Sequence, residues 1–336
     1  MTVLRTPKKP AIAGLMAAAL VLASPGPAAH AQAWRPDKTV EFVIPTGPGA
    51  NNDRMVRLVQ KVLQEQKLVI TPVVALNKPG GNQHLAVVYL GQKGADPHTV
   101  LLSNPTLFTN ELQGISQQHH SALTPLSLLV VESNVFTVQA GSPMKGMRDL
   151  MDRIRANPDS VSFAMPSRGG VTHLAAGAAA KAAGLDPKKL KVVVFKASGE
   201  SITALAGGHV DVMVSSLASV TPHVKAGTLR VLGIAAQQRR GGIAANVPTL
   251  REQGIATDGV AAWRGLHGPK GLAPAHVAYW EENFAKVTDS ADWKGFLEEN
   301  DLVSQFMRSR DFAKFLEGEY AITKALAADV GIIKSP

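Results

Sequence analysis

Residues 39–53 read TVEFVIPTGPGANND and contain, in order, a strand, a loop and the start of a helix. The first six residues are rich in β-branched and apolar side chains, which predicts a strand that ends at Pro45. Glycine and proline then predict a tight loop. The apolar positions that follow have the spacing of one face of a helix, and they are Met55, Leu58, Val59, Val62 and Leu63. Asn51, Asn52 or Asp53 can supply its N-cap.

The same order of strand, loop and helix recurs along the chain. Further strands are predicted at residues 73–76, 99–102, 161–164, 192–195, 210–214 and 229–234. This alternation favours parallel sheets covered by helices on both faces. About ten strands is the upper limit for an open twisted sheet, so we expect two sheets. Helical patterns after Pro274 predict helices that cover them.

Residues 1–31 have the pattern of a cleaved secretory signal. Three basic residues precede an apolar run at residues 11–23, and Ala29-His30-Ala31 offers small residues to a signal peptidase. The alternative is a membrane anchor, but a spanning helix needs about 20 apolar residues. Pro25-Gly26-Pro27 interrupts this run. We therefore expect an exported, soluble mature chain.

Composition excludes several classes of protein. The 336 residues are 45% hydrophobic and 18% charged, which is typical of a globular protein and not of a disordered one. Cysteine is absent, which excludes disulfides, cysteine metal sites and thiolate nucleophiles. Loss of residues 1–31 lowers the formal charge from +9 to +6. With 5% aromatic residues and no basic run, the chain favours an anionic small molecule over nucleic acid.

The strand-end loops are the places to look for a site, because small ligands of such sheets bind outside the carboxyl ends of the strands. The loop at residues 46–53 lacks the Lys-Ser/Thr of a P-loop and the third glycine of a dinucleotide-binding motif. It can still direct backbone N–H groups and a helix N-terminus at a carboxylate, unless its glycines only make the turn. Other loops with small or hydroxyl residues lie at 80–82, 103–104, 167–173, 198–201 and 215–216.

Three side chains in these loops have alternative roles. Arg168 can offer two parallel hydrogen bonds to a carboxylate, or it can be a solvated surface residue. His173 fits packing or capping at a helix start better than useful titration. Asp53 fits a structural role that orients the first loop better than that of a base.

Catalytic and metal-binding patterns have little support. Ser142-Pro143-Met144-Lys145 spells S-x-x-K, but no K-T-G partner is present. G-x-S-x-G and H-E-x-x-H are absent. His119 and His120 are adjacent, and adjacent residues on a helix or strand face different ways. We therefore expect no catalytic residue, no metal and no cofactor.

The chain resembles the substrate-binding receptors of tripartite tricarboxylate transporters, also called Bug receptors, from about Arg35 to Ile333. The segments that carry the resemblance are VIP (43–45) with the loop to Asp53, NKPGG (77–81), DPHTVL (96–101), GGHVDVM (207–213), PHVKAGTLRVL (222–232), VPTLREQG (247–254), WRG (263–265) and PKG (269–271). Each segment is weak alone, but their order and spacing are specific.

The resemblance implies an α/β, two-lobed periplasmic binding protein fold of type II. Each lobe is expected to be a mostly parallel sheet flanked by helices, and crossover strands form the hinge. The expected boundaries are a signal peptide at 1–31, lobe 1 at 32–135 plus 256–336, and lobe 2 at 136–255. In such receptors the lobes close on a carboxylate that is held largely by backbone N–H groups and waters.

The candidate ligand-binding residues come from strand-end loops of both lobes. Those of lobe 1 are Thr46, Gly47, Gly49, Ala50, Asn51, Asp53, Gly80, Gly81, Ser103 and Asn104. Those of lobe 2 are Ser167, Arg168, Gly169, Gly170, Thr172, His173 and Ser215. This chain departs from the family's common Pro-Pro-Gly-Gly at residues 46–49. Arg168 stands where small polar residues are common, which suggests a second anionic group on the ligand.

The resemblance implies a periplasmic solute-binding receptor that captures a small carboxylate by lobe closure. A monomer would deliver this ligand to the membrane permease subunits of a tripartite transporter. Two alternatives remain: a receptor that presents its ligand to a sensor kinase, and a periplasmic enzyme that acts on carboxylates. The enzyme is the less favoured, because the loops offer no nucleophile with a base and an orienting group.

Overall fold

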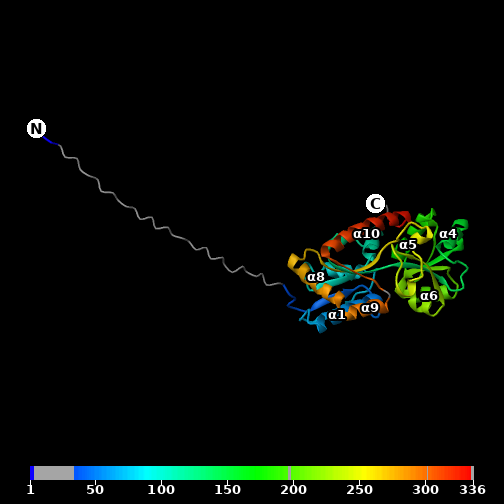
Figure 1. The fold of residues 1–336 in the computed structure, drawn as a ribbon, viewed down its shortest axis with the longest axis horizontal. Helices are drawn as coiled ribbons and strands as arrows, with labels where there is room; N and C mark the ends of the chain where they lie inside the picture. The colour runs from blue at the N-terminus through cyan, green and yellow to red at the C-terminus, as the bar shows by residue number, and fades with distance from the viewer. Residues whose placement is uncertain (4–33, 196–197, 301, 334–336) are drawn as a thin grey trace. The chain divides into compact units, whose positions relative to one another are not determined.

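The strands of the chain form two separate sheets, A and B, each covered by helices (Figure 1). The computed structural model describes residues 1–3, 34–195, 198–300 and 302–333. Apart from its first three residues, the predicted signal segment lies outside the described part of the chain.

Sheet A has six strands in the order β11-β4-β10-β3-β1-β2. These strands are β1 (Val40–Ile44), β2 (Val73–Asn77), β3 (Thr99–Ser103), β4 (Leu123–Glu132), β10 (Ala262–Pro269) and β11 (Ser304–Arg308). Strand β1 runs parallel to β2 and β3. Strand β10 runs antiparallel to β3 and β4, and β11 runs antiparallel to β4.

Sheet B has five strands in the order β7-β6-β8-β5-β9. These strands are β5 (Asn134–Gln139), β6 (Ser162–Met165), β7 (Lys191–Val194), β8 (Val212–Ser216) and β9 (Leu229–Ala235). Strand β6 runs parallel to β7 and β8, whereas β5 runs antiparallel to β8 and β9. The predicted α/β fold with two sheets is confirmed. Both sheets are mixed, because β5 and β10, the strands that follow the two passages between the sheets, run antiparallel to the neighbouring β8 and β3.

The chain passes directly between the sheets at Ser133. Strand β4 ends at Glu132 and β5 begins at Asn134, so a single residue separates a strand of sheet A from a strand of sheet B. The return passage, residues 236–261, joins β9 to β10. Side chains on these two passages are therefore placed close to both sheets.

Helices cover both faces of sheet A, because successive side chains of each strand point to opposite faces and both faces are apolar. Phe42 packs with α1 (Asn51–Glu65), α8 (Pro274–Asp289) and α9 (Ala291–Glu299). Val43, one residue later, packs with α2 (His84–Gly91), α3 (Thr106–Leu112) and α10 (Ser309–Asp329). Successive strand residues point to opposite faces, so the continuous apolar sequence of β1 serves two cores.

Sheet B is built in the same way. Phe163 packs with α4 (Met147–Ala156) and α5 (Val171–Ala182) on one face. Ala164 packs with α6 (Ser198–Ala206) and α7 (Leu217–Lys225) on the other. Short 3₁₀ helices complete the chain at His120–Ala122, Pro158–Ser160, Pro187–Lys189, Gly242–Ala244 and Arg251–Gln253.

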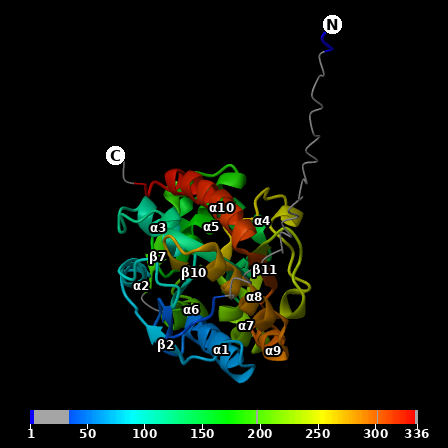
Figure 2. The same cartoon turned by 90° about the vertical axis from the view of Figure 1, so that its left-hand side faces the viewer.

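Helix α10 contacts the helices of both sheets, and Figure 2 shows it beside α3 and α5. Its first half buries Phe312 against sheet A, and its end packs Ala327 against Leu174 of α5. Lys181 of α5 also forms an ion pair with Asp329 at 2.7 Å. Among the described residues, no helix combines the length and hydrophobicity that crossing a bilayer requires.

The approach of α10 to β10 predicts a stability effect. A Cβ at Gly265 would lie 2.2 Å from the Phe312 ring, so Gly265→Ala must displace a fully buried side chain. We expect overpacking to lower the free energy of unfolding by about 1–3 kcal/mol, measured by urea denaturation.

The matched control is Gly318→Ala in α10, the helix that contains Phe312. A Cβ added at Gly318 meets no neighbouring atom within 4 Å. This substitution should raise the free energy of unfolding by roughly 0.5–1 kcal/mol. Equal stabilities for the two variants would contradict this account of the packing.

Candidate ligand-binding site

Asp53 fixes the shape of the first loop. Its carboxylate accepts hydrogen bonds from Gly49 N–H at 2.8 Å, from the Asn77 amide at 2.9 Å and from Arg57 Nε at 3.0 Å. Gly49 has φ of +79°, a conformation that glycine adopts without strain. The Asn77 amide also donates to the Thr46 carbonyl at 2.9 Å. Asp53 thus orients the loop, which is the structural role that the sequence favoured.

The charge on Asp53 is strongly stabilised. The Arg57 guanidinium lowers the pKa of the Asp53 carboxyl to about 2, and hydrogen bonds from Gly49 and Asn77 contribute to the same shift. The side chain is buried, and the helix N-terminus favours a negative charge there. Asp53 is therefore ionised at neutral pH and has its acceptors occupied.

The other predicted residues of the first loop, and those of the second loop at residues 80–82, have small side chains and offer mainly backbone groups. Ala50 is the N-cap of α1, and Gly47 accepts a hydrogen bond from its N–H at 3.4 Å. Gly80 and Gly81 are exposed, with φ of +133° and +55°. The Asn110 amide holds the second loop by donating to the Gly81 carbonyl at 3.2 Å. Neither loop's glycines line the cavities described below.

The loop before α5 is built around His173. Gly169, with φ of +76°, donates its N–H to His173 Nδ1 at 2.9 Å. Burial lowers the pKa of His173 to about 4, and the positive charge of Arg168 adds to the shift. His173 is thus a neutral, buried acceptor at the start of the helix. Gly170 lies so close to Ser167 that a Cβ would approach its Oγ to 2.3 Å.

A cavity of about 190 Å³ lies between the strand ends of the two sheets. Its lining comes from the ends of β3, β6 and β8, from strand residues on either side of the two passages between the sheets, and from helices α3, α5, α6 and α7. The residues that line it are Asn104, Pro105, Thr106, Glu132, Asn134, Pro166, Val171, Thr172, Ser201, Met213, Val214, Ser215, Ser216, Ser219, Ala262 and Arg264. Hydroxyl and amide groups thus converge with one cation and one carboxylate.

Three of the predicted site residues line this cavity: Asn104, Thr172 and Ser215. The Thr172 hydroxyl is buried and has no hydrogen-bond partner among the described residues. A smaller adjoining cavity contains Asn51 together with Glu132 and Arg264. The structure therefore brings part of the first loop and part of the loop before α5 to one region.

Other predicted residues are placed elsewhere. Ser103 is fully buried, and its Oγ lies 2.7 Å from His267 Nδ1. Arg168 is exposed, and its Nη2 donates to the Val192 carbonyl at 3.2 Å. Thr46 has a buried hydroxyl with no hydrogen-bond partner among the described residues, and it is not one of the residues that line the 190 Å³ cavity.

Arg264 is the cation of the cavity, and the sequence did not single it out as a ligand-binding residue. Its Nε donates to Asn52 Oδ1 at 2.8 Å, and its Nη1 donates to the Trp263 carbonyl at 3.0 Å. Its Nη2 lies 3.6 Å from Glu132 Oε2, a buried oxygen without a hydrogen-bond partner. The sequence feature that could have identified Arg264 is its position as the one arginine within β10, which is largely apolar. A charge in a buried strand requires a partner.

The network at Asp53 predicts a pH dependence of stability. A folded-state pKa of about 2, below the ordinary value of 3.8, stabilises the fold above about pH 4. This stabilisation, on the order of 2 kcal/mol, is lost as the pH falls from about 4 to 2. Asp53→Asn should therefore lower the free energy of unfolding at pH 7 and flatten its dependence on pH below 4, measured by urea denaturation.

Asp149→Asn, at an exposed carboxylate that accepts only the Lys145 N–H at 2.7 Å, is the control. If the two variants had the same pH profile, the network around Asp53 would have no special role in stability.

Known proteins resemble this chain over most of its length. The model of the family described as "Tripartite tricarboxylate transporter family receptor" matches residues 55–332. A Cupriavidus necator protein named "UPF0065 protein in gbd 5'region" is 27% identical over 325 residues, which cover 96% of this chain and 97% of that protein. Protein BugT of Bordetella pertussis is 25% identical over 259 residues, which cover 76% of this chain and 78% of BugT.

Solved structures share the fold. An R. palustris protein determined with adipate has a TM-score of 0.76 and 23% identity, and the match covers 88% of this chain and 98% of that one. MatC of Rhodopseudomonas palustris, with bound malate, has a TM-score of 0.72 and 22% identity, with coverage of 87% and 99%.

The family model spans more than half of the chain and includes all of sheet B and every strand of sheet A except β1. It begins within α1 and extends past the end of α10. The chain belongs to the receptor family of the tripartite tricarboxylate transporters.

Proposed function

We propose that this protein is a periplasmic receptor that captures a small carboxylate between two lobes and delivers it to a membrane permease. Lobe 1 comprises residues 32–135 and 256–336, and lobe 2 comprises residues 136–255. The signal pattern at residues 1–31 supports export. Membership in the receptor family supports delivery to a tripartite transporter.

The observation that carries this proposal is the cavity at the strand ends. Its lining combines the hydroxyls of Thr172, Ser201 and Ser215 with the guanidinium of Arg264. The N-terminus of α5 lies there as well, since Val171 and Thr172 are its first residues. Small hydroxyl groups, helix N–H groups and a guanidinium are the groups that bind carboxylates in proteins.

Arg264 has hydrogen-bonding capacity left for a ligand. A guanidinium carries five N–H donors, and the two hydrogen bonds to Asn52 and the Trp263 carbonyl use two of them. A micromolar site needs about 8 kcal/mol, and hydrogen bonds to a charged group contribute roughly 1.5–3 kcal/mol each. Arg264 therefore acts as one anchor among several donors that include Thr172 and backbone N–H groups.

Glu132 limits which carboxylates suit the cavity. Its Oε2 is buried, forms an ion pair with Arg264 and accepts no hydrogen bond from the described residues, so a ligand carboxylate oxygen beside it would be repelled. A hydroxyl or amino group on the ligand would instead donate to it. The malate bound to MatC is a dicarboxylate with a hydroxyl, which supports a ligand of this kind.

Binding is favoured over catalysis by the state of the buried imidazoles. Burial lowers the pKa of His267 to about 3, and its Nδ1 is occupied by Ser103 Oγ. His173 is neutral and accepts the Gly169 N–H. Neither of these two rings is among the residues that line the cavity, so neither is a base directed at a ligand there.

A thermal-shift screen against malate, adipate, citrate and amino acids would identify a ligand. A ligand at a concentration of 100 times its Kd stabilises the folded protein by about 2.7 kcal/mol. Calorimetry with that ligand then tests Arg264. We expect Arg264→Gln to weaken binding at least tenfold, because an anionic group loses its charged donor.

Removal of one partner from a buried ion pair also destabilises the fold, so the double variant Arg264→Gln/Glu132→Gln is the control for folding. It should recover stability and still bind weakly. Arg168→Gln, which removes an exposed arginine, should leave the affinity within twofold. Two results would contradict this role of Arg264. One is wild-type affinity in the double variant. The other is a greater loss of affinity in Arg168→Gln than in Arg264→Gln.

A further inference from the structure

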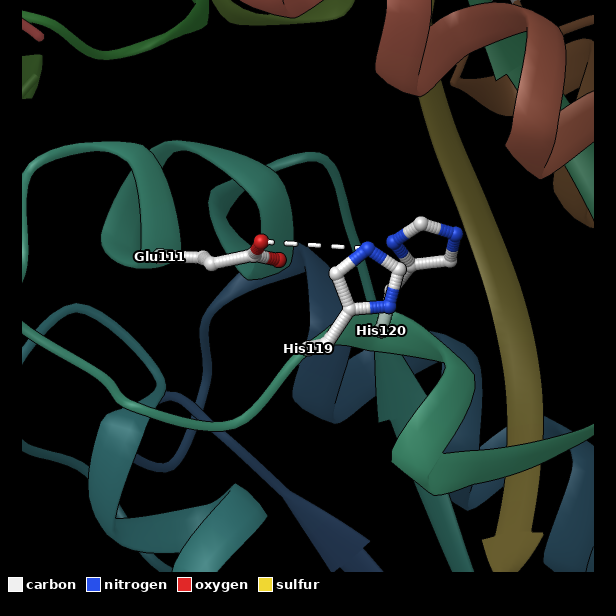
Figure 3. Close-up of side chains that lie close together, drawn as sticks. All are labelled: Glu111, His119 and His120. Atoms are coloured by element: carbon white, nitrogen blue, oxygen red, sulfur yellow. Dashed lines mark ion pairs between the residues drawn. The ribbon is translucent and has the colours of Figure 1, made fainter.

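Glu111, His119 and His120 gather in one place outside the ligand cavity (Figure 3). Glu111 lies in α3, and the two histidines lie at the start of the next 3₁₀ helix. One potential ligand atom from each residue lies within 4.8 Å of the other two. His119 Nε2 is 3.8 Å from Glu111 Oε1.

The backbone explains why two adjacent histidines converge, contrary to our expectation from sequence. His119 is extended, with φ of −69° and ψ of 147°, and it caps the 3₁₀ helix that begins at His120. The regular alternation of a strand or helix therefore does not apply across this junction. The two rings lie 4.1 Å apart between centroids, at an angle of 37°.

Two polar atoms of this cluster are buried and have no hydrogen-bond partner in the part of the chain that the structure describes. They are His120 Nδ1 and Glu111 Oε2. Buried polar atoms in proteins are nearly always paired, so two orphaned atoms in one cluster point to a missing partner. A carboxylate oxygen accepts, and His120 Nδ1 accepts in the tautomer that has its proton on Nε2, so in that tautomer the partner must be a donor or a cation.

We propose that Glu111, His119 and His120 form a zinc-binding site. Two imidazole nitrogens and one carboxylate are a common ligand set for Zn²⁺, with the fourth position left to water. The ligand atoms of a tetrahedral zinc ion at about 2.1 Å lie roughly 3.4 Å apart, whereas the three candidate atoms here lie within 4.8 Å of one another, so the side chains must draw together around the ion. Mg²⁺ and Ca²⁺ prefer all-oxygen sites and fit this set poorly.

Neighbouring residues orient the proposed ligands. The Tyr320 hydroxyl donates to Glu111 Oε1 at 2.5 Å, which leaves Oε2 available. Ser121 Oγ lies 2.8 Å from His119 Nδ1, which also accepts the Ser121 N–H at 3.2 Å. Zinc binding through Nε2 requires Nδ1 to carry the proton, to donate it to Ser121 Oγ and to give up the hydrogen bond from the Ser121 N–H. Such partners fix the tautomer and ring orientation of metal-binding histidines. His119 is about half exposed, with 47% of its side-chain surface accessible, which gives the ion a path from solvent.

The ion would tie the end of α3 to the 3₁₀ helix beneath Tyr320 of α10. The other end of this segment, Asn104 to Thr106, lines the ligand cavity.

The test is calorimetric titration of Zn²⁺ into protein that was purified without a polyhistidine tag and treated with EDTA. We expect saturation at one equivalent, no heat with Mg²⁺, and a rise in melting temperature with Zn²⁺. His119→Ala, at an exposed position that should not impair folding, and Glu111→Gln should each weaken Zn²⁺ binding at least tenfold.

His209→Ala, at an exposed histidine in another part of the chain, is the matched control and should bind as the wild type does. Two results would overturn the proposal. One is the absence of saturable Zn²⁺ binding to the wild-type protein. The other is equal binding by the wild type, His119→Ala and Glu111→Gln, which would indicate adventitious binding to surface histidines.

Discussion

The buried pair of Arg264 and Glu132 is the interaction on which the proposed site depends. Glu132 ends β4 where the chain leaves sheet A, and Arg264 lies in β10 after the chain has returned. Ala262 is paired with Glu132, so Arg264 lies two residues further along the same face of β10. Through Asn52, Arg264 also reaches the start of α1. One guanidinium thus connects the first loop, both passages and the ligand cavity.

The helix α10 constrains how the two proposed lobes can move. Its first half packs on sheet A, and its last turn packs on α5 and forms the ion pair with Lys181. Gly177 makes this approach possible, because a Cβ there would lie 2.4 Å from Val330. A closing motion would therefore pivot near the end of α10. The lobes would separate most along the side lined by α9 and residues 240–242, where a cavity of about 500 Å³ lies.

Local features of the fold could be predicted from the sequence because they depend on short-range patterns. The strand, loop and helix at residues 39–65 follow from apolar spacing, and the structure has β1 and α1 there. The rule that ligands bind at strand ends led to Asn104, Thr172 and Ser215, which share one cavity. Arg264 and Glu132 could not be paired in this way, because their contact depends on the register of two strands far apart in sequence. The convergence of His119 and His120 depends on one backbone junction.

The central claim is that ligand binding closes two lobes around the Arg264 cavity. The absence of cysteine allows clean labelling of Glu299→Cys and Gly241→Cys, two exposed positions in α9 and in the segment across the 500 Å³ cavity. Pulsed electron spin resonance then measures the distance between spin labels. The account predicts that a saturating carboxylate shortens this distance by several ångströms, and that Arg264→Gln abolishes the change at the same concentration. A distance that stays the same in wild-type protein shown by calorimetry to be saturated would contradict it.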